Sequence, residues 1–197
     1  MRILGHWKLR RFAACNQVVG WPSAISGYLR IEAAHGNRIV FEEGVTLRNI
    51  SLSFGHSGNT LIFRAGTNPT GRFIMNGGAT IEIGKATRFH KSVWLQAHEG
   101  RSITIGRDCL LADVRIRTSD IHKILDSRTK RRLNYAADVN ISDHVWLAEG
   151  VSIYKGASIG ENSVIGAHAV VTRSIPSNCV AVGCPAEVIR RNIIWKP

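Results

Sequence analysis

The chain has 197 residues, and its 26 lysines and arginines outnumber its 14 aspartates and glutamates, giving a formal net charge of +12. This length predicts one domain with terminal extensions, and no apolar run approaches the ~20 residues that a membrane-spanning helix needs. The positive charge predicts an anionic partner, such as a phosphate-bearing cofactor, an acidic glycan, nucleic acid or an anionic membrane surface, with general solubility as the alternative.

Residues 1–35 show no regular repeat and are expected to form an N-terminal cap. One side of an amphipathic helix in this segment would carry Ile3, Leu4, Trp7, Phe12 and Val18. A helix lying on a membrane surface is the alternative interpretation. The basic residues that interrupt the segment do not fit a signal peptide, and four cysteines without C-x-x-C spacing predict reduced, mostly buried thiols. We therefore expect a cytoplasmic protein.

Residues 36–182 are expected to form a β-solenoid. Between about 36 and 118 a six-residue spacing of apolar residues is imperfect, as in Ile83, Phe89 and Leu95. Later in the chain the spacing is regular and places an apolar residue at Ile141, Leu147, Ile153, Ile159, Ile165 and Val171. A helix would instead repeat every 3.6 residues. A period of six suits short strands separated by turns, three of which make one triangular coil, and stacked coils then share a narrow core.

An extended loop is expected at residues 118–138, where the repeat is interrupted. Ile105 and Ile141 are 36 positions apart, which equals six hexads, so the repeat resumes in phase. The interruption is polar, strongly basic and holds one histidine. A long loop inside a regular solenoid is uncommon unless it is functional. Residues 183–197 leave the repeat and are expected to form a C-terminal tail, with one or two helical turns that close the other end.

The stretch from residue 102 to 191 contains S-D-x-H, H-V-W-L, V-I-G-A-H-A-V-V-T-R-S-I-P and V-G-C-P-A-x-V-I-R in this order. It resembles the hexapeptide-repeat O-acetyltransferases of bacterial surface polysaccharides, and among them most the enzymes that acetylate sialic-acid capsules. The resemblance implies an all-β fold, the left-handed parallel β-helix, assembled as a homotrimer. It also implies acetyl-CoA as donor, no metal, and a catalytic histidine in a loop that faces the neighbouring subunit.

The resemblance places the catalytic base at His122, in the S-D-x-H motif. Transfer of an acetyl group to a sugar hydroxyl needs a base that removes the hydroxyl proton, and histidine titrates near the working pH. Trp146 is expected to donate its indole N–H to the thioester carbonyl or its oxyanion, or to support the pantetheine arm as an aromatic platform. Asp120 either orients the imidazole or caps the loop turn. Weaker candidates for the base are His144, His168, His90 and His98.

The resemblance places the donor along the last coils, with small residues and backbone beside the pantetheine arm and arginines at the phosphates. The residues expected to meet acetyl-CoA are Ala148, Glu149, Ala167, Thr172, Arg173 and Arg190. Two residues depart from the family pattern. Glu187 stands at the phosphate end, where many relatives have a basic or small residue, and Tyr135 stands where relatives often have proline.

The acceptor is expected to be an acidic carbohydrate, because the loop carries Lys123, Arg128, Lys130, Arg131 and Arg132. The same charges would suit CoA phosphates or simply solubility. Nucleic acid is disfavoured, since no aromatic platform interleaves the basic residues. Three functions stay open: a glycan O-acetyltransferase, an N-acetyltransferase acting on an amino-sugar nucleotide, and a non-catalytic hexapeptide-repeat scaffold. Peripheral association with a membrane or with glycan-synthesis machinery is a further expectation.

Overall fold

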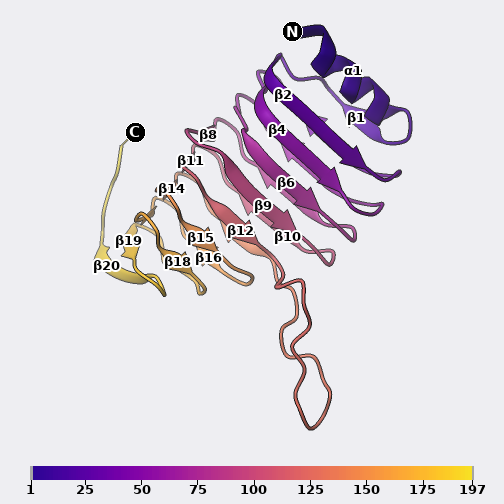
Figure 1. The fold of residues 1–197 in the computed structure, drawn as a ribbon. Helices are drawn as coiled ribbons and strands as arrows, with labels where there is room; N and C mark the ends of the chain where they lie inside the picture. The colour runs from indigo at the N-terminus through magenta and orange to yellow at the C-terminus, as the bar shows by residue number, and fades with distance from the viewer. Residues whose placement is uncertain (1, 197) are drawn as a thin grey trace.

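The computed structural model describes residues 2–196, which form a β-solenoid with one helix at its N-terminal end (Figure 1). Its strands stack as three sheets, and all neighbours are parallel except the last pair. Sheet A consists of β1 (Gln17–Val19), β3 (Arg38–Phe41), β5 (Thr60–Phe63), β7 (Thr80–Ile83), β10 (Ser102–Ile105), β13 (Val139–Ile141) and β16 (Ser158–Ile159).

The second and third faces of the triangular prism are sheets B and C. Sheet B consists of β2 (Ala24–Ala33), β4 (Thr46–Phe54), β6 (Gly71–Met75), β9 (Val93–Ala97), β12 (Arg115–Arg117), β15 (Ser152–Ile153) and β18 (Val170–Val171). Sheet C consists of β8 (Arg88–Phe89), β11 (Leu110–Leu111), β14 (Trp146–Leu147), β17 (Val164–Ile165), β19 (Cys179–Val182) and β20 (Glu187–Arg191). The predicted left-handed parallel β-helix is confirmed.

The core is a narrow column in which each coil covers the next. The six predicted hexad residues from Ile141 to Val171 have exposed fractions of 0–2%. In the N-terminal coils the column contains a run of phenylalanines. The rings of Phe41 and Phe63 stack with centroids 5.8 Å apart, and those of Phe63 and Phe73 meet edge to face at 5.4 Å. Burying apolar side chains against neighbouring coils is the main stabilising contribution in such a solenoid.

The hexad pattern is clear only in the C-terminal half because the coils differ in length. Paired residues of successive coils are 18 positions apart near the end, as for Asn140 with Ser158. Near the start they are 21 and 22 positions apart, as for Gln17 with Arg38 and Arg38 with Thr60. The longer coils contain longer strands and turns, so three hexads no longer describe one coil.

The N-terminal cap is shorter than the predicted segment 1–35. Helix α1 (Arg2–Ala13) packs Leu9 and Phe12 into the core, but Trp7 is 55% exposed. The side chains of Ile3 and Leu4 lie outside the described part, and Val18 belongs to β1. Strands β1 and β2 already pair with β3 and β4, so the solenoid begins at Gln17 rather than near residue 36. A bulge between Ser26 and Leu29 hides the repeat there.

The C-terminal tail contains a strand where helical turns were predicted. Strand β20 pairs antiparallel with β19, and the chain then runs back along the solenoid toward β14 (Figure 1). Four of the five residues of β20 are exposed and Val188 is partly buried, which fits an edge strand. Cys109 and Cys179 are buried while Cys15 and Cys184 are exposed, so half of the thiols rather than most are buried. In the described part, no helix has the length and apolar character to cross a membrane.

Candidate active site

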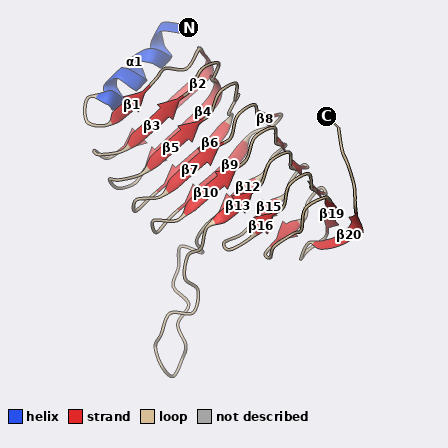
Figure 2. Cartoon of the chain, turned by 180° about the vertical axis from the view of Figure 1, so that it is seen from behind, coloured by secondary structure: helices blue, strands red, loops and turns tan. Residues whose placement is uncertain are grey.

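The loop that carries His122 leaves the solenoid at the corner between sheets B and A. It connects β12 with β13 and projects well away from the coils in both views (Figures 1 and 2). Val139 still pairs with Ile103, which confirms that the repeat resumes in phase after the loop. The loop therefore adds to the solenoid without altering its core.

A charged cluster fixes the base of the loop. Glu99, in the turn after β9, accepts two hydrogen bonds from Arg132 at 2.5 and 2.8 Å and one from the Ser119 hydroxyl at 2.6 Å. These bonds, first the one from Arg132, lower the pKa of Glu99 to about 2. Arg132 also lies over the Tyr135 ring at 5.3 Å. Arg132, predicted to meet the acceptor, is thus bound to the protein itself.

Asn134 holds the backbone on both sides of His122. Its amide nitrogen donates to the His122 carbonyl at 2.8 Å, and its amide oxygen accepts from the Ile124 N–H at 2.7 Å. The same amide nitrogen donates to Asp120 at 2.8 Å. Asn134 is 8% exposed. Sequence reasoning missed this role, because only the neighbouring Tyr135 departs visibly from the family pattern.

Asp120 contacts Lys155 and Asn134 rather than the imidazole of His122. Lys155, in the turn of the next coil, pairs with the Asp120 carboxylate and is the main cause of its lowered pKa. Within residues 2–196, no hydrogen bond or ion pair engages the exposed His122 imidazole. In a single chain Asp120 therefore fixes the loop against the coil below it, and the imidazole is free for a ligand.

Trp146 lies on a different face of the prism, in a cleft on sheet C. The cleft has a volume of about 430 Å³ and is lined by His90, Leu110, Ala112, Trp146, Ala148, Glu149, Trp195 and Lys196. Three residues predicted for the site, Trp146, Ala148 and Glu149, thus lie together. The Glu149 carboxylate pairs with Lys91 at 2.6 Å, which lowers its pKa, and the Ala148 N–H donates to Ile165 at 3.0 Å.

The C-terminal tail forms one wall of this cleft, a feature that the sequence did not reveal. Trp195 stacks on His144, with ring centroids 4.2 Å apart, and donates its indole N–H to the His144 carbonyl at 2.9 Å. The His144 ring also contacts the Asn162 amide oxygen at 3.0 Å. His144 is therefore covered by the tail, which weakens it as a candidate base.

The other histidines occupy separate places. His90 lines the cleft beside Trp146, and His168 lies exposed in the turn after β17. His98 lies near the base of the loop, where burial lowers its pKa, and its Nε2 has no partner among the described residues. Of the candidates for the base, only His122 lies in the projecting loop.

The residues predicted for the donor divide between two places. Arg190 is exposed in the same outward row of sheet C as Trp146, because Trp146 pairs with Val164, Val164 with Val180 and Val180 with Arg190. Three strand spacings of about 4.8 Å place these two residues roughly 14 Å apart. Ala167 lies exposed in the turn between β17 and β18. Thr172 and Arg173 instead follow β18, at the same corner as the loop.

The predicted site residues therefore lie in two separate groups, named here the loop half-site and the cleft half-site. The loop half-site, at the corner between sheets B and A, carries His122, Thr172 and Arg173. The cleft half-site, on sheet C and its edge, carries Trp146, Ala148, Glu149 and Arg190, with Ala167 in the turn beside it.

Comparison with known proteins shows that the chain is similar to hexapeptide-repeat acetyltransferases. Residues 138–173 match the family "Bacterial transferase hexapeptide (six repeats)". The crystal structure of the polySia-specific acetyltransferase NeuO superimposes with a TM-score of 0.82 and 33% identity over 93% of this chain and 85% of that chain. The polysialic acid O-acetyltransferase OatWY gives a TM-score of 0.85 and 25% identity over 92% of this chain and 88% of that chain.

Within this class, a curated relative with a similar sequence is a polysialic acid O-acetyltransferase. The polysialic acid O-acetyltransferase of Escherichia coli O1:K1 / APEC is 54% identical over 95 residues, which are 48% of this chain and 31% of that protein. The chain spans between 31% and 60% of the length of the first curated relatives it matches. The chain belongs to the hexapeptide-repeat acetyltransferase family of the polysialic acid O-acetyltransferases.

Proposed function

We propose that this protein transfers an acetyl group from acetyl-CoA to a hydroxyl of polysialic acid or a closely similar acidic capsule polymer. The observation that carries the proposal is the likeness to the polySia-specific acetyltransferase NeuO, which extends over 93% of the chain. The loop adds support, because it brings an unpaired histidine together with exposed basic residues. The proposed place of action is the cytoplasm.

The proposed active form is a homotrimer in which the loop half-site of one subunit meets the cleft half-site of the next. His122 lies in the loop between sheets B and A, and Trp146 lies in β14 of sheet C, so one copy does not bring them together. Two different faces that meet head to tail close into a ring when the rotation between copies is one third of a turn. Each of the three sites then contains His122 of one subunit and Trp146 of its neighbour.

The proposed chemistry is general-base catalysis by His122. The imidazole takes the proton of a sugar hydroxyl while the hydroxyl oxygen attacks the thioester carbonyl carbon. The carbon–sulfur bond then breaks, and the departing CoA sulfur receives the proton from the imidazolium. The Trp146 indole N–H would donate to the carbonyl oxygen as that oxygen gains negative charge. Asn134 holds the loop backbone so that the imidazole keeps its position.

Acetyl-CoA would lie along the outer face of sheet C. With the thioester at Trp146, its arm would follow the outward row of this sheet, and Arg190, roughly 14 Å away by strand spacing, would meet a phosphate. Arg173 would reach the same cofactor from the loop half-site of the neighbouring subunit. No hydrogen bond or ion pair within residues 2–196 engages either guanidinium, so both are available for an anion.

The test is an assay with acetyl-CoA and three acceptors: polysialic acid, an amino-sugar nucleotide and a neutral glycan. We expect release of the CoA thiol only with polysialic acid, together with a mass increase of one acetyl group that mild base removes, since an ester is base-labile and an amide is not. Base-stable acetylation of the amino-sugar nucleotide would show an N-acetyltransferase instead. No thiol release with any acceptor would favour a scaffold.

A further inference from the structure

The outer face of sheet B carries a row of arginines that the proposed chemistry does not use. Along this row Arg30 pairs with Ser51, Ser51 with Arg72, Arg72 with Trp94 and Trp94 with Arg115. Paired residues of neighbouring strands point to the same side of a sheet. Arg30, Arg72 and Arg115 are all exposed, so they project together from every second coil.

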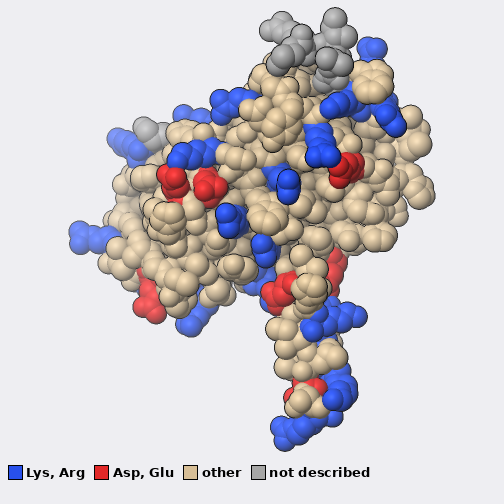
Figure 3. Space-filling view, in the orientation of Figure 1, with Lys and Arg blue, Asp and Glu red and all other residues tan. Residues whose placement is uncertain are grey.

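The row is long and regular. Every second coil is two strand spacings, so the arginines follow one another at about 10 Å, and the whole row spans about 19 Å. Lys and Arg side chains cross this face in the space-filling view, over the strands labelled β2 to β12 in Figure 1 (Figure 3). Such a spacing fits a linear polymer that repeats its negative charge, rather than one small anion.

The charge distinguishes this face from sheet A. The strands of sheet B contain five arginines and one acidic residue, Glu32. The strands of sheet A contain one arginine and one glutamate among small and apolar residues. Like charges repel when they are brought together, so sheet A is the better face for contact between subunits and sheet B is free to meet a ligand.

An aromatic side chain lies within the row. Trp94 is half-buried between Arg72 and Arg115, and the Arg117 guanidinium lies 5.1 Å from its ring centre. The Trp94 indole N–H is buried and has no acceptor within the described residues. Because this atom is buried, Trp94 offers a bound ligand the exposed part of its ring rather than its N–H. In the hollow that Arg72 and Trp94 line, the aromatic side chains are Trp94, which Arg117 covers, and the exposed Tyr28 of β2. A platform for successive nucleic-acid bases needs rings that follow one another along the face, and these two lie three strands apart.

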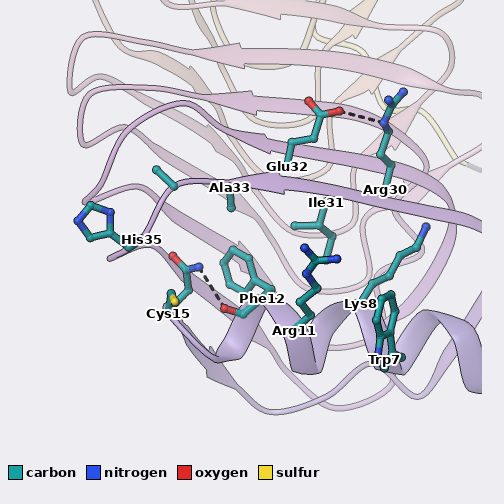
Figure 4. A pocket seen from close by; sticks show the side chains of 12 residues that line it. Trp7, Lys8, Arg11, Phe12, Cys15, Arg30, Ile31, Glu32, Ala33 and His35 are labelled. Atoms are coloured by element: carbon teal, nitrogen blue, oxygen red, sulfur yellow. Dashed lines mark hydrogen bonds and ion pairs between the residues drawn. The ribbon is translucent and has the colours of Figure 1, made fainter.

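The row continues at both ends into other basic parts of the chain. Toward the N-terminus, Lys8 and Arg11 of α1 point toward Arg30 and Glu32 in a hollow of about 550 Å³ (Figure 4). A second hollow of about 650 Å³ shares Lys8 and Arg30 and includes Arg72 and Trp94. Toward the C-terminus, Arg117 is followed directly by the loop of His122. A polymer bound to the row would therefore lead to the loop.

We propose that the outer face of sheet B is a second, non-catalytic binding site for a linear acidic polysaccharide with one carboxylate per sugar unit. This site would hold one segment of the polysaccharide while a distant segment of the same polysaccharide molecule is acetylated at His122. This inference rests on the proposed function for the identity of the polymer. The binding itself depends only on Arg30, Arg72 and Arg115, with Trp94 between them.

The test measures binding and transfer separately. Binding of long polysialic acid to the whole protein, without acetyl-CoA, is measured by titration calorimetry for the wild type, Arg72→Ser, Arg115→Ser and the double variant. Each single substitution is expected to weaken binding about two- to five-fold, the range for an exposed ion pair, and the double variant more. Glu32→Gln is expected to tighten binding, because it removes the carboxylate that competes for Arg30 at 3.0 Å.

Two controls make the result specific. Lys85→Ser removes one positive charge from an exposed turn between β7 and β8, and it is expected to change binding by less than the experimental error. The double variant is expected to raise KM for long polysialic acid while kcat, and transfer to a dimer of sialic acid, stay unchanged. Unaltered binding by the double variant, or an equal loss for long and short acceptors, would overturn the proposal.

The outcome also distinguishes this site from the proposed function. A wild type that binds polysialic acid through Arg72 and Arg115 but transfers no acetyl group would refute the proposed function and retain the binding site. A wild type that binds a single-stranded oligonucleotide of equal charge more tightly than polysialic acid would overturn the choice of a glycan as partner.

Discussion

Replacement of Glu99 by glutamine should loosen the loop that carries His122 without unfolding the coils. The Glu99 carboxylate joins the turn after β9 to Arg132 and Ser119 at the base of the loop. A pKa lowered from 4.5 to about 2 corresponds to ~3 kcal/mol at about 1.36 kcal/mol per pKa unit. The Glu99 side chain is 36% exposed, so solvent screening reduces this to about 1–2 kcal/mol.

The pH dependence follows from the direction of this pKa change. Because the folded-state pKa of Glu99 lies below its unfolded value, the stabilisation is complete above about pH 4.5 and is lost as the pH falls toward 2. At neutral pH the wild type therefore has the full contribution. Glu99→Gln removes the charge at every pH and leaves a side chain of nearly equal size.

Hydrogen exchange at neutral pH is the direct measurement. The Leu133 N–H bonds to Ile124 at 2.8 Å and the Ala137 N–H bonds to Thr118 at 3.0 Å. These two amides should lose protection by about 5- to 30-fold, the factor for 1–2 kcal/mol, while Tm should change by less than about 2 °C because the coils keep their packing. Glu43→Gln, in an exposed turn between β3 and β4, is the matched control. Unchanged protection and unchanged transfer in Glu99→Gln would refute the reasoning.

Three further substitutions test the two half-sites. His122→Ala should lower kcat about 100-fold or more by removing the general base, with the Kd for CoA unchanged, whereas a similar loss for His144→Ala alone would move the base to that residue. Asn134→Ala should lower kcat about ten-fold through the freed backbone beside His122, and normal kcat with normal loop protection would contradict its positioning role. Arg190→Ala should raise KM for acetyl-CoA about ten-fold or more, as expected for a charged hydrogen bond, and an equal rise in KM for the glycan would point to general damage.

Much of the fold could be predicted from the sequence because a solenoid repeats its contacts. The apolar residues from Ile141 to Val171 recur every six positions, and their burial follows directly from that period. The loop could be predicted from the same period, because the interruption begins and ends in phase. The first coils could not, since their 20–22-residue length and the bulge in β2 conceal the repeat. The prediction of helical turns in the C-terminal tail was wrong, because β19 provides an edge with which β20 pairs.

The candidate site could be predicted in part. His122 and Trp146 were predicted from motifs, and their catalytic roles stay a prediction. The structure shows that Ala148 and Glu149 line one cleft with Trp146. Hydrogen bonds that side chains make with residues far away in the sequence do not follow the six-residue repeat, so the sequence pattern does not predict them. Arg132 bonds to Glu99 33 positions away, and Trp195 bonds to His144 51 positions away. For the same reason the predicted basic wall of the loop included Arg132, which is already paired.

Mixing two inactive variants tests the central claim that each active site is shared between subunits. His122→Ala and Trp146→Ala are each expected to be nearly inactive alone. When they are unfolded together in equal amounts and reassembled, three quarters of the trimers should contain both variants. Each such trimer has one junction with an intact His122 and an intact Trp146, so about one quarter of the wild-type transfer rate should return. No recovery in mixed trimers confirmed by mass would contradict the shared site.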